Sequence, residues 1–183
     1  MVRELAHIYQ KLCREKIEAY NRILPFGELL VDRWEKAKIC GFGKNTSIYD
    51  SSIVMGNVKV GRDVWIGPFS LLDGSGATLY IGNGCSISSG VHIYTHDTVN
   101  YCVSGGKADK ETAPVNIGDY CYVGPMSIIA KGVSLGKSCI VAANSFVNKS
   151  YPDYAIVAGN PAKIIGHVVV GRDGNVKRIY HKK

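Results

Sequence analysis

The chain has 183 residues, of which 46% are hydrophobic and 20% charged, and its formal net charge is +7. This composition indicates one globular domain with appendages, and the scattered Lys and Arg residues, without interleaved aromatics, argue against a nucleic-acid partner. No apolar run has transmembrane length and residues 1–20 are too charged for a signal peptide, so we expect a cytoplasmic chain without an integral membrane segment.

The N-terminal segment has the pattern of an amphipathic helix from residue 4 to about residue 20. Its apolar residues recur at helical spacing: Leu5, Ile8, Tyr9, Leu12, Ile17 and Tyr20. Pro25 lies in the break that follows, and a second helix is expected over about 28–38. We expect this segment to cap the domain that follows; a role in holding an acceptor at a subunit boundary is the alternative.

From Val58 to Val147 an aliphatic side chain returns every sixth residue, a period that neither a helix nor a single strand has, and the same register extends back to Ile48. The aliphatic column is Ile48, Val54, Val60, Ile66, Leu72, Ile81, Ile87, Ile93, Ile117, Val123, Ile129, Leu135, Val141 and Val147. Two places earlier in each hexad stands a residue that is nearly always small or β-branched, Cys85, Cys121 and Cys139 among them. Such hexads are the signature of a parallel β-helix, in which three hexads form one coil and both columns point inward.

Glycine often follows the aliphatic residue directly, at positions 61, 67, 82, 118, 124 and 136. We expect these glycines at corners of the coil, where φ is positive. The six cysteines include no CxxC pair, and those of the inward column are interpreted as core residues.

The repeat is interrupted twice. The step from Leu72 to Ile81 is nine residues, so 73–76 is predicted to bulge from a corner. Residues 97–114 are polar and lack both inward columns, which predicts one long loop at a corner. The expected domains are therefore an N-terminal cap (1–40), a β-helix with this inserted loop (41–150) and a C-terminal unit (151–183), in which 167–170 and 176–180 form a hairpin over the last coil.

Several segments together carry a family resemblance: Val91–Asp97, Val115–Gly124, Val141–Ser145 and Gly159–Lys163. The chain resembles the hexapeptide-repeat acyltransferases, most closely their maltose, galactoside and polysaccharide O-acetyltransferases. The resemblance implies an all-β solenoid, a left-handed parallel β-helix assembled as a homotrimer. It also implies acetyl-coenzyme A as the acyl donor and a sugar or polysaccharide-precursor hydroxyl as the acceptor.

Acetyl transfer to a hydroxyl needs a base, and a histidine suits this because its ordinary pKa is close to neutral pH. His96 is the candidate base, in the spacing of the polysaccharide branch, and Asp97 is the candidate to orient its imidazole. His92 is the rival histidine, expected on an outer face. With Asp73 and Tyr122 it is a candidate for acceptor contact.

The resemblance also assigns the donor site. Gly124, Ala142 and Ala143 match positions where small residues admit the pantetheine arm, and Lys149 and Lys163 match positions whose cations meet the nucleotide phosphates. Two alternatives remain from the residues alone: N-acetylation of an amino sugar or antibiotic amine, and a non-catalytic or metal-binding hexapeptide trimer. We expect no metal, since only His92 and His96 lie in the repeat region.

Overall fold

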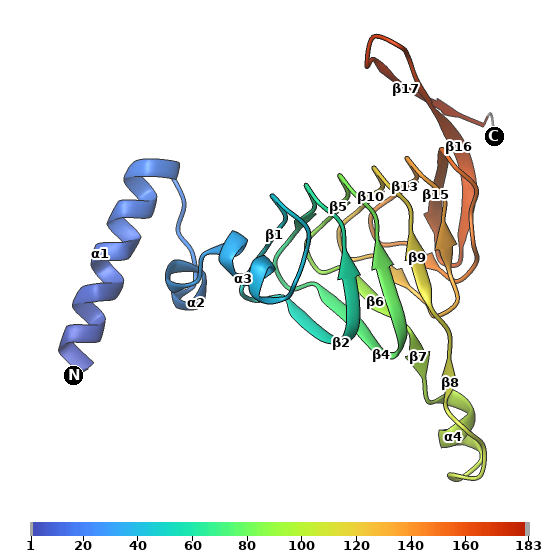
Figure 1. Cartoon of the computed structure of the whole chain (residues 1–183), viewed down its shortest axis with the longest axis horizontal. Coiled ribbons are helices and arrows are strands. Elements are labelled where there is room, and N and C mark those ends of the chain that lie inside the picture. Colours follow the sequence, from blue (N-terminus) through green and yellow to red (C-terminus); the bar gives the residue numbers. More distant parts are fainter. Residues whose placement is uncertain (1, 182–183) are drawn as a thin grey trace.

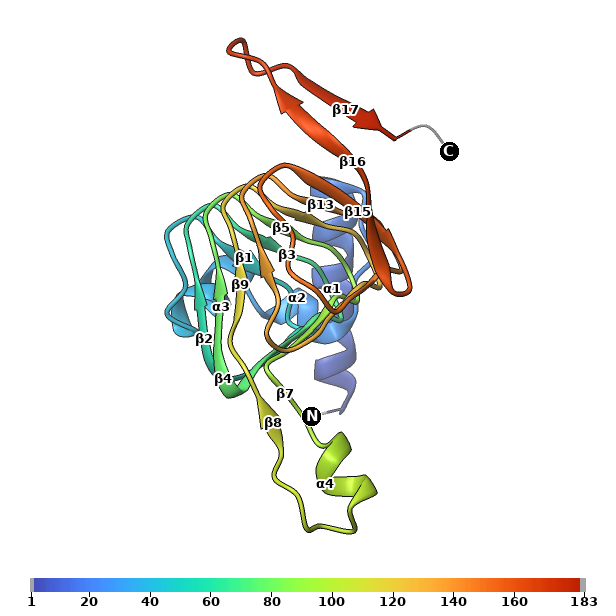
Figure 2. The ribbon, with the colours of Figure 1, turned by 90° about the vertical axis from the view of Figure 1, so that its right-hand side faces the viewer.

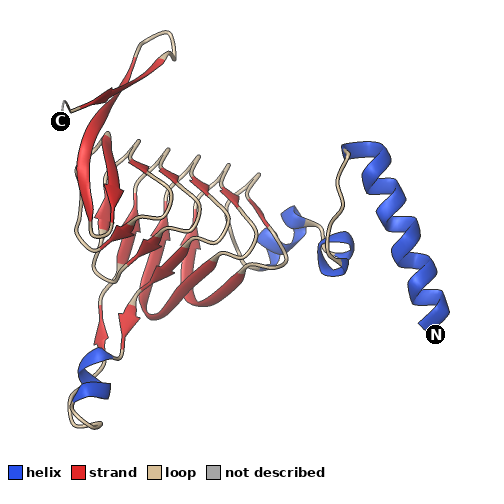
Figure 3. Ribbon diagram, turned by 180° about the vertical axis from the view of Figure 1, so that it is seen from behind, coloured by secondary structure: helices blue, strands red, loops and turns tan. Residues whose placement is uncertain are grey.

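The structure is a computed structural model that describes residues 2–181. Its centre is a stack of short parallel strands that the chain visits in rotation along three sides (Figures 1 and 3). In the regular part, paired residues are 18 apart in sequence, as Ser47 with Trp65 and Tyr122 with Ile140. Three hexads therefore complete one turn, and this pairing fits the predicted parallel β-helix.

The first side consists of β1 (Ser47–Ile48), β3 (Trp65–Ile66), β5 (Ser86–Ile87), β10 (Tyr122–Val123), β13 (Ile140–Val141) and β15 (Ala155–Gly159). The second side contains the beginnings of β2 (Ile53–Val60) and β4 (Leu71–Ile81), followed by β6 (His92–Tyr94), β11 (Ile128–Ile129) and β14 (Phe146–Val147). The third side contains the ends of β2 and β4, then β9 (Val115–Ile117) and β12 (Ser134–Leu135).

The core consists of the two inward columns that the hexads predict. All their members are buried except Val54 and Val58, which are half-buried and pack against the core. The small polar members satisfy their hydroxyls within the stack: Ser52 Oγ donates to the carbonyl of Gly67 at 2.7 Å. Interior hydroxyls are thus paired rather than left at a cost of a few kcal/mol.

The corner glycines serve a different purpose from the one predicted. None of the six glycines that follow the aliphatic column has a positive φ; that conformation falls two residues later in most hexads, at Asp63, Tyr120 and Ser138 for example. A Cβ at Gly118 would instead lie 2.7 Å from the backbone of Gly136 in the next coil. Close stacking of coils, not turn conformation, therefore requires glycine here.

The first interruption lies two residues later than predicted. Asp73 and Gly74 still pair in register with Met55 and Gly56, and the register shifts only before Leu79. The extra residues are therefore accommodated over 75–78. Because Asp73 also pairs with Tyr94 of β6, its position in the stack is fixed by a neighbour on each side.

The second interruption is an excursion that we call the stalk, residues 96–112. It comprises β7 (His96–Asp97), α4 (Val99–Val103) and β8 (Glu111–Thr112), and β7 and β8 pair antiparallel. Figure 2 shows it extending from one corner of the coil. The predicted loop is therefore an ordered hairpin base with a helical tip.

The N-terminal segment forms three helices: α1 (Val2–Tyr20), α2 (Phe26–Leu30) and α3 (Arg33–Ile39). The single helix predicted over 28–38 is divided because Asp32 starts α3 as its N-cap, accepting from the N–H groups of Trp34 and Glu35. Only α2 and α3 bury residues, whereas α1 buries none and extends away from the coils (Figure 1).

The chain ends in a hairpin of β16 (Ala162–Val170) and β17 (Val176–Tyr180). β15 joins the first side by pairing with β13, and β16 turns back against β15. All residues of β17 are exposed, and the tip of the hairpin projects from the body (Figure 1). The hairpin exists as predicted, but its outer strand does not cover the last coil.

Candidate active site

His96 is the first residue of the stalk, immediately after the corner that follows β6. Its Nδ1 lies 3.5 Å from Oδ2 of Asp73, and the Asp73 side chain is only 3% exposed. This nitrogen is buried and has no hydrogen-bond partner among the described residues. A buried carboxylate therefore faces one nitrogen of the imidazole and leaves the opposite nitrogen, Nε2, for another group.

The Asp73 carboxylate is held by its own strand. Its Oδ1 accepts from the N–H of Ser75 at 2.9 Å and also from the Ser75 hydroxyl. The backbone carbonyl of Asp73 accepts from the N–H and the hydroxyl of Thr95 at 3.1 and 2.8 Å. These contacts fix Oδ1 and the backbone, and they leave Oδ2 directed at the imidazole.

A close approach of two chain segments sets the position of His96. Thr95 is fully buried, and its hydroxyl accepts from the N–H groups of Gly76 and Ala77 at 3.3 and 3.2 Å. A Cβ at Gly76 would lie 2.5 Å from Cβ of His96. The irregular part of β4 can therefore contact the base of the stalk only because residue 76 has no side chain.

A cleft of about 280 Å³ opens beside the imidazole. It is lined by Ser75, Gly76, His96, Lys110 and Thr112, which come from β4 and from both arms of the stalk. His96 is 30% exposed, so its ring reaches both the buried carboxylate and the cleft. This arrangement can hold a proton donor in the cleft next to a base with a fixed orientation.

Asp97, the predicted orienting carboxylate, has other partners. One of its oxygens accepts from Lys131 and the other from the N–H of Val99 at 3.0 Å. Lys131 also contacts Glu111 at 2.7 Å, so one ammonium group joins both arms of the stalk to the coil. The hydrogen bond from Lys131 lowers the pKa of Asp97, and the same contact raises the pKa of Lys131.

His92 and Tyr122 lie on outer faces of the coil. His92 shares a hydrogen bond of 3.2 Å between its Nδ1 and the Tyr94 hydroxyl, which is a local contact on β6. Tyr122 is 42% exposed on β10, on the first side. Neither lines the cleft beside His96.

The predicted donor residues lie at two different corners of the coil. Gly124 and the pair Ala142–Ala143 are stacked at the corner after the first side, where the N–H of Gly124 donates to Val141 at 2.8 Å. A Cβ at Gly124 would meet the Ala143 nitrogen at 2.6 Å, so coil stacking already requires this glycine. Lys163 is exposed on β16, which pairs with β15 of the same side.

Lys149 belongs to the other corner. Because β14 pairs with β11, Lys149 occupies the position in its coil that Lys131 occupies in the preceding coil, at the corner after the second side. The side chain of Lys149 is exposed. This is also the corner at which the stalk leaves the coil. A single chain thus presents His96 and Lys149 at one corner and the small donor residues at another.

The residues that the structure describes, 2–181, contain neither a membrane-spanning helix nor a metal-binding cluster. No helix among them is long and apolar enough to cross a membrane. No group of three or more His, Cys, Asp or Glu side chains within residues 2–181 is arranged to hold a metal ion.

Comparison with known proteins bears on the repeat itself. Residues 114–149 match the family model described as bacterial transferase hexapeptide (six repeats). Serine acetyltransferase 4 of Arabidopsis thaliana is 37% identical over 97 residues, which is 52% of this chain and 27% of that protein. A putative acetyltransferase of Saccharomyces cerevisiae is 31% identical over 134 residues, 69% of this chain and 58% of that protein.

The resemblance to the hexapeptide-repeat acyltransferases is confirmed. A solved hexapeptide-repeat acetyltransferase of Vibrio cholerae, crystallised with acetyl-coenzyme A, matches with a TM-score of 0.54 at 22% identity over 91% of this chain and 88% of that one. At this identity the match shows a shared hexapeptide-repeat fold. The chain spans about a quarter of the plant relative and 58% of the yeast relative.

The part of the site that sequence reasoning missed is the proximity of Asp73 to His96. The two residues are 23 positions apart and lie on adjacent coils, and Asp73 was assigned to acceptor contact. The available signal was the nine-residue step, because an irregularity in a regular stack often marks a functional corner. Lys131 carried no such signal, since it follows a regular hexad.

Proposed function

We propose that the chain is an acetyltransferase that moves an acetyl group from acetyl-coenzyme A to a hydroxyl of a sugar or polysaccharide precursor. The observation that carries the proposal is the His96 imidazole at the edge of a cleft with its Nδ1 facing the buried Asp73 carboxylate. The matches to acetyltransferases support acyl transfer, and the serine acetyltransferase match supports a hydroxyl acceptor.

In this proposal His96 acts as the general base. Its Nε2 removes the proton of the acceptor hydroxyl as the oxygen attacks the thioester carbonyl, which forms a tetrahedral intermediate. The carbon–sulfur bond then breaks, and the imidazolium gives its proton to the departing thiolate. Asp73 stabilises the imidazolium and keeps Nε2 toward the cleft, which makes it a positioning residue.

The proposal includes a left-handed coil assembled as a homotrimer, and the separation of the donor residues supports the assembly. His96 and Lys149 lie at one corner and Gly124, Ala142 and Ala143 at another, so one chain does not bring them together. Packing the corner of one copy against the neighbouring corner of the next would complete a donor site from two chains. On this basis the trimer is active and the monomer is inactive, and the proposed location of the trimer is the cytoplasm.

The test is thiol release from acetyl-coenzyme A with a panel of acceptors: neutral and acidic sugars, amino sugars and L-serine. We expect turnover with a sugar hydroxyl, and His96→Ala should lower kcat about 10²–10⁴-fold, the contribution of a general base. The kcat of Asp73→Asn should lie between that of the wild type and that of His96→Ala. Coenzyme binding, measured by calorimetry, should stay intact in both variants.

The matched control is His167→Ala, which removes an exposed histidine from β16. Turnover confined to amine acceptors would replace O-acetylation by N-acetylation. Near-normal kcat in His96→Ala would remove the mechanism, whatever the acceptor.

A further inference from the structure

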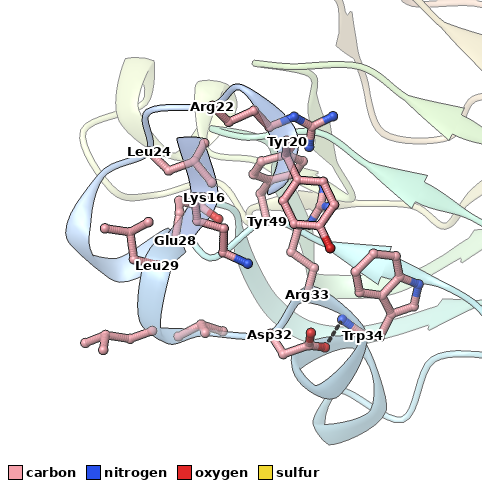
Figure 4. A pocket seen from close by; sticks show the side chains of 12 residues that line it. Lys16, Tyr20, Arg22, Leu24, Glu28, Leu29, Asp32, Arg33, Trp34 and Tyr49 are labelled. Carbon is pink, nitrogen blue, oxygen red and sulfur yellow. Dashed lines mark hydrogen bonds between the residues drawn. The ribbon is translucent and has the colours of Figure 1, made fainter. Parts of the chain in front are cut away.

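A second cavity, of about 380 Å³, lies between the N-terminal helices and the first coil. Figure 4 shows side chains from the end of α1, from α2, from α3 and from Tyr49 around it. Its volume is within the range of about 300–1,000 Å³ that small-molecule sites occupy. It shares no lining residue with the cleft beside His96.

Aromatic rings and cations alternate on the wall of this cavity. The Arg33 guanidinium lies 4.5 Å from the ring centre of Tyr49 and 5.0 Å from that of Trp34. The Lys16 ammonium lies 5.4 Å from the ring centre of Tyr20. Cation–π contact with two rings holds the guanidinium in place and leaves N–H groups for an anion.

The cavity is lined by three cationic and two acidic side chains, and both acidic side chains accept hydrogen bonds from backbone N–H groups. Glu28 is buried and accepts from the N–H groups of Asp50 and Ser51 at 3.0 and 2.9 Å, so it fastens α2 to the first coil. Asp32 accepts the two N–H groups at the start of α3. Among residues 2–181, none of the three lining cations, Lys16, Arg22 and Arg33, is paired with a carboxylate.

Two of the rings also remain open to a ligand. Tyr20 is 64% exposed and Trp34 is 51% exposed, and Figure 4 shows them on the same side of the cavity as Arg33. A flat heteroaromatic ring can stack on these faces, and a phosphate joined to it can reach the unpaired cations. Nucleotides are an abundant class of small molecule that joins a flat ring to a strongly anionic group.

We propose that this cavity, lined by Lys16, Tyr20, Arg22, Arg33, Trp34 and Tyr49, is a nucleotide-binding site distinct from the acetyl-transfer site. Its ligand class is a nucleoside mono- or diphosphate, free or as part of a larger molecule. The base stacks on Trp34 and Tyr20, and the phosphates bind Arg33 and its neighbouring cations. The cavity lies at the N-terminal end of the coils, whereas the stalk leaves the far part of the stack (Figure 1).

The experiment is isothermal titration of the full-length chain with uridine diphosphate in the presence of saturating coenzyme A. The coenzyme occupies any donor site first, because its own nucleotide would compete there. We expect uridine diphosphate to bind under these conditions and Arg33→Met or Trp34→Leu each to weaken binding at least tenfold. Lys149→Met and Lys163→Met, which alter the proposed donor site, should leave uridine diphosphate binding unchanged.

Ligands that carry only the base or only the phosphates test separately whether the base and the phosphates contribute to binding. Uridine and inorganic pyrophosphate should each bind at least tenfold more weakly than uridine diphosphate, and N-acetylneuraminic acid, an anionic saccharide, more weakly still. Trp34 is half-exposed, so Trp34→Leu should fold normally, and circular dichroism with thermal unfolding checks both variants.

Four results would overturn the proposal. They are no binding at millimolar uridine diphosphate, displacement of bound uridine diphosphate by coenzyme A, unchanged binding in both folded variants, and tighter binding of the saccharide or of pyrophosphate. Because the readout is binding, a failure of the proposed acetyl transfer does not affect this outcome.

Discussion

Gly76→Ala is the substitution that most directly tests whether the position of His96 matters. The new Cβ would lie 2.5 Å from Cβ of His96, 2.9 Å from the carbonyl oxygen of Thr95 and 3.1 Å from Cγ2 of Thr112. Ordinary contact between two carbon atoms begins at about 3.5 Å, so the Cβ of His96 must move away from the new Cβ by about 1 Å. The backbone of Gly76 is not in the left-handed region, so the effect comes from contact alone.

We expect this displacement to lower kcat/KM about 10²-fold, as a misplacement of about 1 Å at a reacting group does. Overpacking should also lower the free energy of unfolding by about 1–3 kcal/mol. Both are measurable: thiol release with the best acceptor of the panel, and urea unfolding followed by circular dichroism.

The control is Gly41→Ala. Gly41 has a φ of +72° and no atom within 4 Å of a new Cβ. Its substitution should cost about 1–2 kcal/mol through backbone strain, a comparable loss of stability far from His96. If Gly76→Ala lost stability but kept the kcat/KM of the control, the close packing of β4 against the stalk would have no role in catalysis.

Other parts of the chain give four more predictions. Lys131→Met should release both arms of the stalk and accelerate amide exchange over 98–110. The free energy of unfolding should change by no more than about 1 kcal/mol, as for ion pairs at a protein surface, although Lys131 itself is half-buried. In the wild type this attachment is lost only as the pH falls below about 4, because the pKa of Asp97 is lowered, and it persists beyond about pH 10.5, because the pKa of Lys131 is raised. The readout is the protection factor of the stalk amides, that is, exchange corrected for its own dependence on pH: it should be constant near neutral pH and fall below about pH 4, and a protection factor unchanged in acid would contradict the assignment. Gly118→Ala should destabilise the chain by about 1–3 kcal/mol or more, because its Cβ meets the backbone of the next coil rather than a movable side chain. Without denaturant the exposed Cys102 should react with a thiol reagent while the three buried cysteines of the inward column do not, and reaction of all six free cysteines in the folded chain would contradict the core described above.

The inward columns were predictable because a six-residue period depends only on local alternation. Ile48, Leu72 and Ile129 are fully buried as the hexads require. The role of the corner glycines was misassigned because contact between coils depends on residues about 18 positions away, which a single corner does not reveal. Asp32 divided the predicted second helix because its capping bonds outweighed the continuous helical pattern.

The candidate site was only partly predictable for a related reason. His96 stands out in sequence because the repeat stops beside it, whereas its relation to Asp73 depends on how two coils align. Asp97 is adjacent to His96 in sequence, but the side chains of consecutive residues in an extended strand point in opposite directions. The carboxylate of Asp97 accepts a hydrogen bond from Lys131 instead. Sequence proximity was therefore the wrong guide to the partner of the imidazole.

The stalk departs from the coil at His96 and returns at Thr112 through one antiparallel ladder, after which the next hexad resumes in register. Its entrance and exit are neighbours, so its length and composition can vary without shifting any layer below or above it. Under the proposed function, exchanging this one insert between relatives is therefore a route to a change of acceptor. The coils would keep their structure when the stalk is exchanged, and His96 would still be its first residue.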